Sequence, residues 1–348
     1  MKIIDIFCGV GGFSKGFLDY GAKVAYGIDN WDIALETFKI NHKSTKIIKK
    51  DVRDIPNSFF LKLRKQIDVI ISGPPCQGFS MSGKRNPKDL RNTLFEEVIR
   101  ATDLIKPKIT VMENVVGLKS MKTHNGYPVI DLIKDRFNEI GYKVDCRVLN
   151  AADYGVPQLR KRIFFVASKN LRFIVFPDAT HFEKKQPGKK GKWITVGEAL
   201  KDINSSRRYL SPKNEYQKNM RTSIKKIFNH EIINHSKEII ERMSKVPRGG
   251  NWQNIPKKYY NVGGEHSNNY RRLDPSKPSI TLKHASKSMI IHPFKNRGIT
   301  VREVARLQSF DNSFIFKGVK YDQHQQLANA VPPLFGYAFA KKFKKILK

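Results

Sequence analysis

Short apolar runs alternate with longer amphipathic stretches through the first half of the chain, and this alternation constrains the fold more than any other feature. The runs have the length of buried strands and lie at residues 2–7, 23–28, 46–49, 68–72, 109–112, 142–149 and 163–167. Helices are expected between them, at residues 14–20, 31–41, 91–105 and 130–140. Such a series predicts an α/β fold with a doubly wound, mostly parallel sheet.

The composition changes after about residue 178, where lysines crowd around Pro187, Gly188 and Gly191. This cluster predicts a domain boundary or an exposed loop. Up to about residue 297, basic residues are interleaved with aromatic ones, a pattern that suits DNA recognition but also an ordinary small domain with a charged surface. Beyond it, a capping box at residues 300–303 opens a helix. Phenylalanines at helical spacing in residues 335–343 predict a last helix that packs on the first domain.

The charge balance points to a polyanionic partner. The chain has 65 Lys and Arg against 31 Asp and Glu, a formal net charge of +34, and nucleic acid is the leading candidate. Cys8, Cys76 and Cys146 lie far apart, as expected of reduced thiols in a cytoplasmic protein. The sequence predicts no metal site, because the cysteines and histidines lack ligand spacing, and no signal peptide or membrane span.

A glycine-rich stretch, residues 8–14, follows the first apolar run, and Asp29 follows the second. Glycines let the backbone turn sharply and approach a ligand closely, and an acid at the tip of the second strand commonly holds ribose hydroxyls. A dinucleotide site would favour glycine in place of Ser14. S-adenosylmethionine, which has a ribose but no pyrophosphate, fits at least as well.

Gly73-Pro74-Pro75-Cys76-Gln77-Gly78-Phe79-Ser80 follows the run at residues 68–72. Two prolines end the strand, so a thiol is presented at the edge of the sheet where ligands of open α/β folds bind. A lone cysteine is most often a small buried apolar residue, so the turn alone does not establish a nucleophile.

With its motifs taken in order, the chain resembles the DNA (cytosine-5)-methyltransferases of bacteria and archaea. The motifs that carry the resemblance are residues 5–13, 73–80, 113–115, 158–162, 271–273 with 278–281, and 329–333. Two positions depart from the pattern: Ala328 stands where the family usually has glycine, and Trp31 lies one place later than the aromatic residue that often follows the acid.

The resemblance implies a sheet of the S-adenosylmethionine-dependent methyltransferase type with a second, smaller target-recognition domain. Residues 1–178, completed by 320–348, would form the catalytic domain. Residues 179–297 would form the target-recognition domain, and 298–319 a hinge helix.

The resemblance also implies the catalytic roles. Because C5 of cytosine is a weak nucleophile, the Cys76 thiolate would add at C6 and activate C5. Glu113, kept neutral by burial, would protonate or hydrogen-bond N3, and Arg162 would hold O2. Cys8 and Cys146 are interpreted as packing residues.

The implied contacts with S-adenosylmethionine, whose product is S-adenosylhomocysteine, include Asp29 on the ribose and Asp51 on the adenine. The full set is Phe7, Gly9, Gly11, Asp29, Asp51, Pro75, Leu94 and Asn329. The expected DNA contacts are Ser80, Ser82, Lys84, Arg85 and Arg160. Residues 80–87 would close over the DNA, with Ser82 filling the space of the flipped base and Arg160 on a phosphate.

The expected function is cytosine-5 methylation of a short double-stranded DNA site, as the modification enzyme of a type II restriction–modification system. The protein would be a monomer of the prokaryotic cytoplasm, near the nucleoid and away from membranes, and a cognate endonuclease would act separately. One alternative is a tRNA methyltransferase, although the Cys-Phe-Thr tripeptide of that branch is missing. An oxidoreductase would not explain the charge, and intact Cys76 and Glu113 disfavour a non-catalytic DNA-binding protein.

Overall fold

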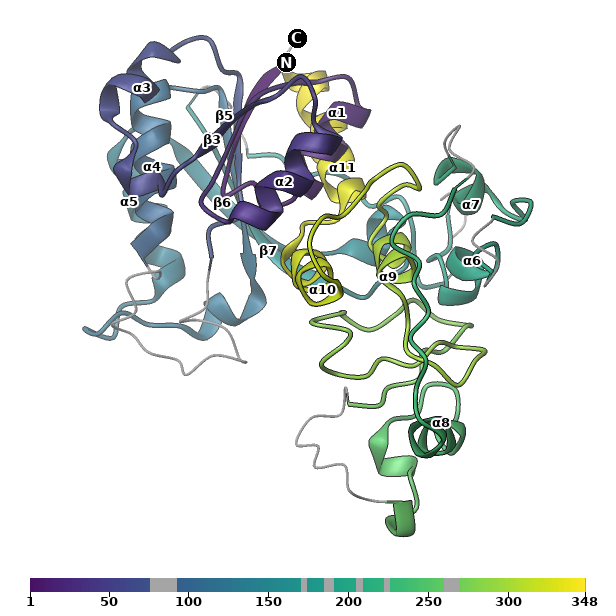
Figure 1. The fold of residues 1–348 in the computed structure, drawn as a ribbon. Coiled ribbons are helices and arrows are strands. Elements are labelled where there is room, and N and C mark those ends of the chain that lie inside the picture. The colour runs from purple at the N-terminus through teal and green to yellow at the C-terminus, as the bar shows by residue number, and fades with distance from the viewer. Residues whose placement is uncertain are drawn as a thin grey trace. The chain divides into compact units, whose positions relative to one another are not determined.

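The structure is a computed structural model that describes residues 1–75, 93–169, 174–184, 191–204, 209–221, 226–259 and 269–347. The chain forms two compact units (Figure 1). Unit 1 comprises residues 1–150, 161–178 and 333–348, and unit 2 comprises residues 151–160 and 179–332. Cys76, Ser80, Ser82, Lys84 and Arg85 lie outside the described residues.

A sheet with the strand order β3-β2-β1-β4-β5-β7-β6 forms the centre of unit 1. Its strands are β1 (Lys2–Ile6), β2 (Lys23–Asp29), β3 (Lys46–Lys49), β4 (Val69–Ser72), β5 (Ile109–Val115), β6 (Lys143–Asn150) and β7 (Lys161–Ser168). Strands β1 to β5 pair in parallel, and β7 lies antiparallel to both β5 and β6. The predicted α/β fold with a mostly parallel sheet is therefore confirmed. The order reverses between β1 and β4, which is the position where open α/β sheets bind ligands.

Helices cover both faces of this sheet (Figure 1). One face carries α3 (Asn57–Lys62), α4 (Leu94–Ile105) and α5 (Val129–Glu139), and the other carries α1 (Gly12–Asp19), α2 (Asp32–Asn41) and α11 (Pro333–Ile346). Short 3-10 turns lie at η1 (Val52–Asp54), η3 (Val116–Ser120) and η4 (Ala151–Tyr154). The short helix α3 was not anticipated from the sequence, because six residues are too few to show a helical period.

Helix α11 packs on α1, and the spacing of its phenylalanines predicts such packing without naming the partner helix. Phe339 meets Phe13 of α1 edge-to-face with ring centroids 6.0 Å apart, and it also contacts Phe164 of β7 at 4.9 Å. Gly16 and Gly336 lie where the two helices approach each other, and a Cβ on Gly336 would come 3.1 Å from the Cα of Gly16. Side chains would push the helices apart at this point, so the glycines permit the close contact.

Several strand ends differ from the expected ones, and the structure gives a reason for two of them. The strand predicted at residues 109–112 continues to Val115, because Glu113 and Asn114 pair with Phe164 and Ile163 of β7. A partner strand distant in sequence thus extends the ladder beyond the apolar run. The first strand ends at Ile6, because Phe7 has a φ of 64° and turns the chain out of the extended conformation.

Unit 2 consists mainly of helices and irregular segments, and strand pairing among its described residues is limited to isolated bridges. Its helices are α6 (Val196–Leu200), α7 (Glu215–Asn219), α8 (Lys237–Ser244), α9 (Val301–Leu307) and α10 (Lys320–Asn329), with turns η5 (Trp252–Asn254) and η6 (Lys257–Tyr259). The predicted capping box is present, since Thr300 Oγ1 accepts from the Glu303 N–H and Glu303 accepts from the Thr300 N–H. No helix in the described part of the chain has the length and apolar character needed to cross a membrane.

Buried arginines connect the irregular segments of unit 2. Arg272 donates to the carbonyls of Val246, Met243, His292 and Lys295 at 2.6–3.1 Å. A guanidinium has five N–H donors, so one side chain can satisfy several backbone carbonyls that lack a strand partner.

Candidate active site at the carboxyl edge of the sheet

The loop after β1 is fastened to the end of β2. The backbone N–H groups of Phe7 and Cys8 both donate to the Ile28 carbonyl, at 2.9 and 3.1 Å. The Gly9 N–H donates to Asp29 Oδ2 at 2.7 Å. Gly9 has a φ of 50°, and a Cβ added there would meet no atom within 4 Å. Gly9 therefore borders open space, with the Asp29 carboxylate beside it.

Asp29 is held in a fixed orientation. Its Oδ1 accepts hydrogen bonds from the backbone N–H groups of Asn30 and Trp31, at 2.8 and 2.9 Å. Burial raises the pKa of Asp29, while these backbone hydrogen bonds act in the opposite direction. A carboxyl group oriented in this way at the tip of β2 can accept hydrogen bonds from the hydroxyl groups of a ribose.

Gly11 is the N-cap of helix α1, and it packs against Phe38 of α2 and against His42, which directly follows α2. It has a φ of 81°, and a Cβ there would overlap His42 and come 2.7 Å from Phe38 Cδ2. The His42 ring stacks on Phe38 with centroids 4.1 Å apart, and its Nε2 lies 3.1 Å from the Gly11 carbonyl oxygen. Burial lowers the pKa of His42 to about 4, so the ring is neutral at physiological pH. His42 was not predicted to support the loop, since nothing in its local sequence indicates that contact.

Asp5 and Ser14 form a buried pair behind the same loop. The Ser14 hydroxyl donates to Asp5 Oδ2 at 2.6 Å. Burial, with Asp29 nearby, raises the pKa of Asp5 to about 8. Ser14 occupies the position where a dinucleotide pattern would favour glycine, and its hydroxyl is the hydrogen-bond partner of this acid. The structure thus gives the departure from that pattern a physical reason.

Asp51, predicted on the adenine, follows β3 and caps η1. It accepts from the Arg53 side chain at 2.9 and 2.7 Å, and this arginine lowers the pKa of Asp51. Leu94 is buried as the first residue of α4, and Pro75 is half-buried.

Three strands bring the proline turn, an acid and an arginine together. Ser72 at the end of β4 pairs with Met112 of β5, so Gly73 lies beside Glu113, and a Cβ on Gly73 would be 3.9 Å from Glu113 Oε2. Glu113 Oε1 lies 3.0 Å from Arg162 Nε of β7, and the two side chains are only 12% and 14% exposed. The turn that leads to Cys76 therefore begins next to an ion pair that is largely protected from solvent.

Arg160, which is expected to contact a DNA phosphate, is buried within unit 2. Its side chain is 2% exposed, and one guanidinium nitrogen donates to the carbonyls of Ala328 and Ala330, both at 3.0 Å. A surface arginine would be needed to reach a DNA phosphate, so this geometry gives that contact no support. Asn329, between these two alanines, is exposed at the end of α10, and its Oδ1 accepts from Gln325 at 3.0 Å.

The family model described as C-5 cytosine-specific DNA methylase matches residues 1–345. The chain belongs to this family. The chain is 36% identical to the type II methyltransferase M.DdeI of Desulfomicrobium norvegicum, across 98% of this chain and 88% of that protein. It is 38% identical to the type II methyltransferase M1.HphI of Haemophilus parahaemolyticus, across 99% of this chain and 87% of that protein.

Solved structures agree with this assignment. A putative DNA modification methyltransferase encoded within an Escherichia coli prophage superposes with a TM-score of 0.80 at 26% identity, covering 100% of this chain and 99% of that one. A DNMT2 mutant of Spodoptera frugiperda shares the fold, with a TM-score of 0.62 at 18% identity over 99% of each chain. The protein is thus a DNA cytosine-5-methyltransferase, as its motifs predict.

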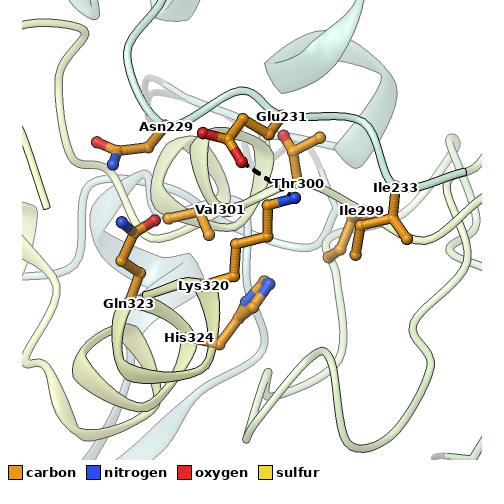
Figure 2. Close-up of a pocket in the computed structure, with 9 residues that line it drawn as sticks. All are labelled: Asn229, Glu231, Ile233, Ile299, Thr300, Val301, Lys320, Gln323 and His324. Atoms are coloured by element: carbon orange, nitrogen blue, oxygen red, sulfur yellow. Dashed lines mark ion pairs between the residues drawn. The ribbon is translucent and has the colours of Figure 1, made fainter. Parts of the chain in front are cut away.

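Unit 2 of this methyltransferase also contains a small hollow, of about 260 Å³ including space open to solvent. Figure 2 shows Lys320 reaching toward Glu231 across it, and their ion pair measures 3.0 Å. His324 also lines the hollow, where burial lowers the pKa of its imidazole to about 4. None of the predicted site residues lines this hollow, so it is separate from the candidate active site.

Proposed function

We propose that the protein transfers a methyl group from S-adenosylmethionine to C5 of a cytosine flipped out of a short, specific double-stranded DNA site. The observation that carries this proposal is the Glu113–Arg162 pair beside the turn that leads into Cys76. The names of the curated relatives support a role as the modification enzyme of a type II restriction–modification system. A cognate endonuclease would then act as a separate protein, and the methyltransferase would act as a monomer.

The residues around the β1 loop fit S-adenosylmethionine. Gly9 borders open space, Asp29 is oriented by three backbone N–H groups, and a protonated Asp5 adds no charge behind the loop. When bound, S-adenosylmethionine supplies a methyl group on an electrophilic sulfonium. By resemblance, the residues that would hold it are Phe7, Gly9, Gly11, Asp29, Asp51, Pro75, Leu94 and Asn329. Asp51 would keep its arginine partner while it accepts from the adenine amino group.

Cys76 would carry the covalent step, although its placement lies outside the described residues. Its thiolate adds to C6 of the cytosine, and the electrons of the C5–C6 double bond then make C5 nucleophilic. C5 would take up the methyl group, with S-adenosylhomocysteine as the leaving group, and a base would then remove the C5 proton. The double bond forms again and the thiolate leaves, so the cysteine is regenerated.

Glu113 and Arg162 would stabilise the base during this addition. Negative charge develops on the ring as the thiolate adds. Glu113 would have to take up a proton when the base is bound, and the protonated carboxyl group would offset the charge by donating to N3. Arg162 keeps Glu113 oriented at 3.0 Å and would donate to O2 of the base. Loss of such a proton donor typically slows a reaction by about 10²–10⁴-fold.

Different parts of the chain would carry catalysis and target recognition. Residues 1–178, completed by 320–348, would carry catalysis, and residues 179–297 would carry target recognition. Residues 298–319 would form a hinge helix, and this segment lies within unit 2. Residues 80–87 would close over the DNA, with Ser80, Ser82, Lys84 and Arg85 as contacts, and flipping the base costs a few kcal/mol.

Trapping on DNA that carries 5-fluorocytosine tests the covalent step, because fluorine at C5 blocks the final elimination. With S-adenosylmethionine present, the wild-type protein should form a complex with the DNA that survives denaturing electrophoresis. Cys76→Ala should bind the DNA but leave no such complex. Cys146→Ala is the matched control, since this thiol lies on β6 away from the site, and it should trap normally. A covalent complex of Cys76→Ala would refute the assignment.

A further inference from the structure

We propose that Arg160 and Gln308 are positioning residues that hold the end of helix α10, and with it Asn329, in place. The proposal rests on the proposed function, in which Asn329 contacts S-adenosylmethionine. It assigns Arg160 a role inside unit 2 in place of the expected contact with a DNA phosphate.

The end of α10 leaves carbonyl groups that the backbone cannot satisfy. In a continuing helix, the Ala328 carbonyl would accept from the N–H four residues later, but Pro332 occupies that position and has no N–H. Pro333 follows directly and begins α11. The last turn of α10 therefore needs donors from elsewhere, because an unpaired buried carbonyl is costly.

Arg160 and Gln308 provide these donors. The Arg160 guanidinium donates to the Ala328 and Ala330 carbonyls, both at 3.0 Å, and so spans Asn329 on both sides. Gln308, which is fully buried at the end of α9, donates through Nε2 to the Leu327 carbonyl at 2.7 Å. The cation also lies at the negative end of the α10 dipole, where positive charge is favourable.

These contacts leave the Asn329 side chain exposed while its backbone is held. The Asn329 Oδ1 accepts a hydrogen bond from the neighbouring Gln325 side chain, and the residue is exposed. Arg160 reaches this turn from 168 residues earlier in the sequence, and it lies two positions before Arg162. The QxRxR element thus contributes one arginine to each unit: Arg162 to the ion pair with Glu113, and Arg160 to the Asn329 turn.

Arg160→Lys tests this role, because lysine keeps the charge but its side chain is one bond shorter and does not bring the ammonium to the position of the guanidinium nitrogen that donates to both carbonyls. Hydrogen exchange of the peptide that covers the last turn of α10 should become faster in the unliganded variant. The KM for S-adenosylmethionine should rise about tenfold with a much smaller change in kcat. The slope of log Kd for DNA against log salt should stay that of the wild type.

Gln308→Met should give the same pattern and replaces Arg160→Lys if that variant does not fold. Arg136→Lys, on an exposed position of α5, is the control and should change none of these quantities. Unchanged exchange with a salt slope lower by about 0.9 would overturn the proposal in favour of a phosphate contact. Asn329→Ala separates the proposed function from this inference. A normal KM for S-adenosylmethionine in this variant would show that Asn329 does not contact the cofactor. The hydrogen exchange of the Arg160 and Gln308 variants would still test whether these residues hold the end of α10.

Discussion

Asp5 is a buried carboxyl group that makes the stability of the protein depend on pH, which the sequence alone does not reveal. It lies in the first apolar run, is 1% exposed and accepts from Ser14. Its pKa of about 8 means that the carboxyl group is protonated at neutral pH, because the interior disfavours a charge and Asp29 is close. The unfolded chain would release this proton, so the native state binds more protons than the unfolded one.

Asp5→Asn should therefore remove a pH dependence of stability. Since the native pKa is raised, the contribution of Asp5 is complete below about pH 4 and is lost as the pH rises toward 8. Between pH 5 and pH 8, the wild type should lose up to about 4 kcal/mol of unfolding free energy relative to Asp5→Asn. Urea denaturation of both proteins at the two pH values measures this difference.

Asp51→Asn provides the comparison of opposite sign. Arg53 lowers the pKa of Asp51, so its stabilisation is present at neutral pH and is lost as the pH falls through the native pKa. Because the Asp51 and Arg53 side chains are partly exposed, their ion pair contributes little to the free energy of unfolding. Parallel pH profiles for the wild type and Asp5→Asn would contradict the protonated state of Asp5.

The conformation of the loop between β1 and α1 depends on side chains from another element. The sequence leads us to expect glycines in this loop, but the structure shows why position 11 has no room for a side chain. Phe38 and His42 lie directly under it, so a side chain would have to displace two packed rings. The loop between β1 and α1 is therefore supported by two stacked side chains, Phe38 of α2 and His42 at its C-cap.

Gly11→Ala should destabilise the protein and weaken binding of S-adenosylmethionine. The positive φ costs about 1–2 kcal/mol for a residue with a Cβ, and overpacking adds about 1–3 kcal/mol. Chemical denaturation and calorimetric titration with S-adenosylmethionine measure the two effects.

Gly21→Ala is the matched control for this substitution. Gly21 has nearly the same φ, 82°, but a Cβ there meets no atom within 4 Å. It should show the backbone cost alone and keep normal affinity for S-adenosylmethionine. Equal losses of stability in the two variants would show that the contact with His42 and Phe38 is unimportant.

At the scale of the whole molecule, the net charge determines how strongly the protein attracts a polyanion. Not all of the basic residues behind the net charge of +34 are available at the surface. Four arginines are buried: Arg160, Arg272, Arg302 and Arg306. Arg306, for example, pairs with Asp202 at 2.9 Å, and Arg302 donates to the carbonyls of Phe228, Asp311 and Phe314. Part of the basic composition thus holds unit 2 together, and the exposed lysines remain for a polyanion.

DNA binding should weaken steeply with salt, because each phosphate contact releases counterions. For about six to ten phosphate contacts, affinity should fall by about 10³–10⁵-fold between 50 and 200 mM salt. Fluorescence anisotropy with a labelled duplex over this range measures the slope. A flat response would show that the exposed charge does not serve DNA binding.

The sequence was sufficient for the class of fold and the type of enzyme. Apolar runs and helical spacing report local backbone structure, and the sheet and the packing of α11 follow from them. The ordered motifs identify the family, because each depends on residue types at fixed spacing. Unit 2 was described only by composition, since its segments are joined by side chains such as Arg272, whose partners lie 20–29 residues away.

Only the folded chain decides which way each polar side chain points. Arg160 and Arg162 are two residues apart and equally basic, yet one is buried against Ala328 and Ala330 and the other faces Glu113. His42 lies under Gly11, and Ser14 donates to Asp5. Local pattern cannot specify such pairs, because a side chain's partner is chosen by the packing of segments that are distant in the chain.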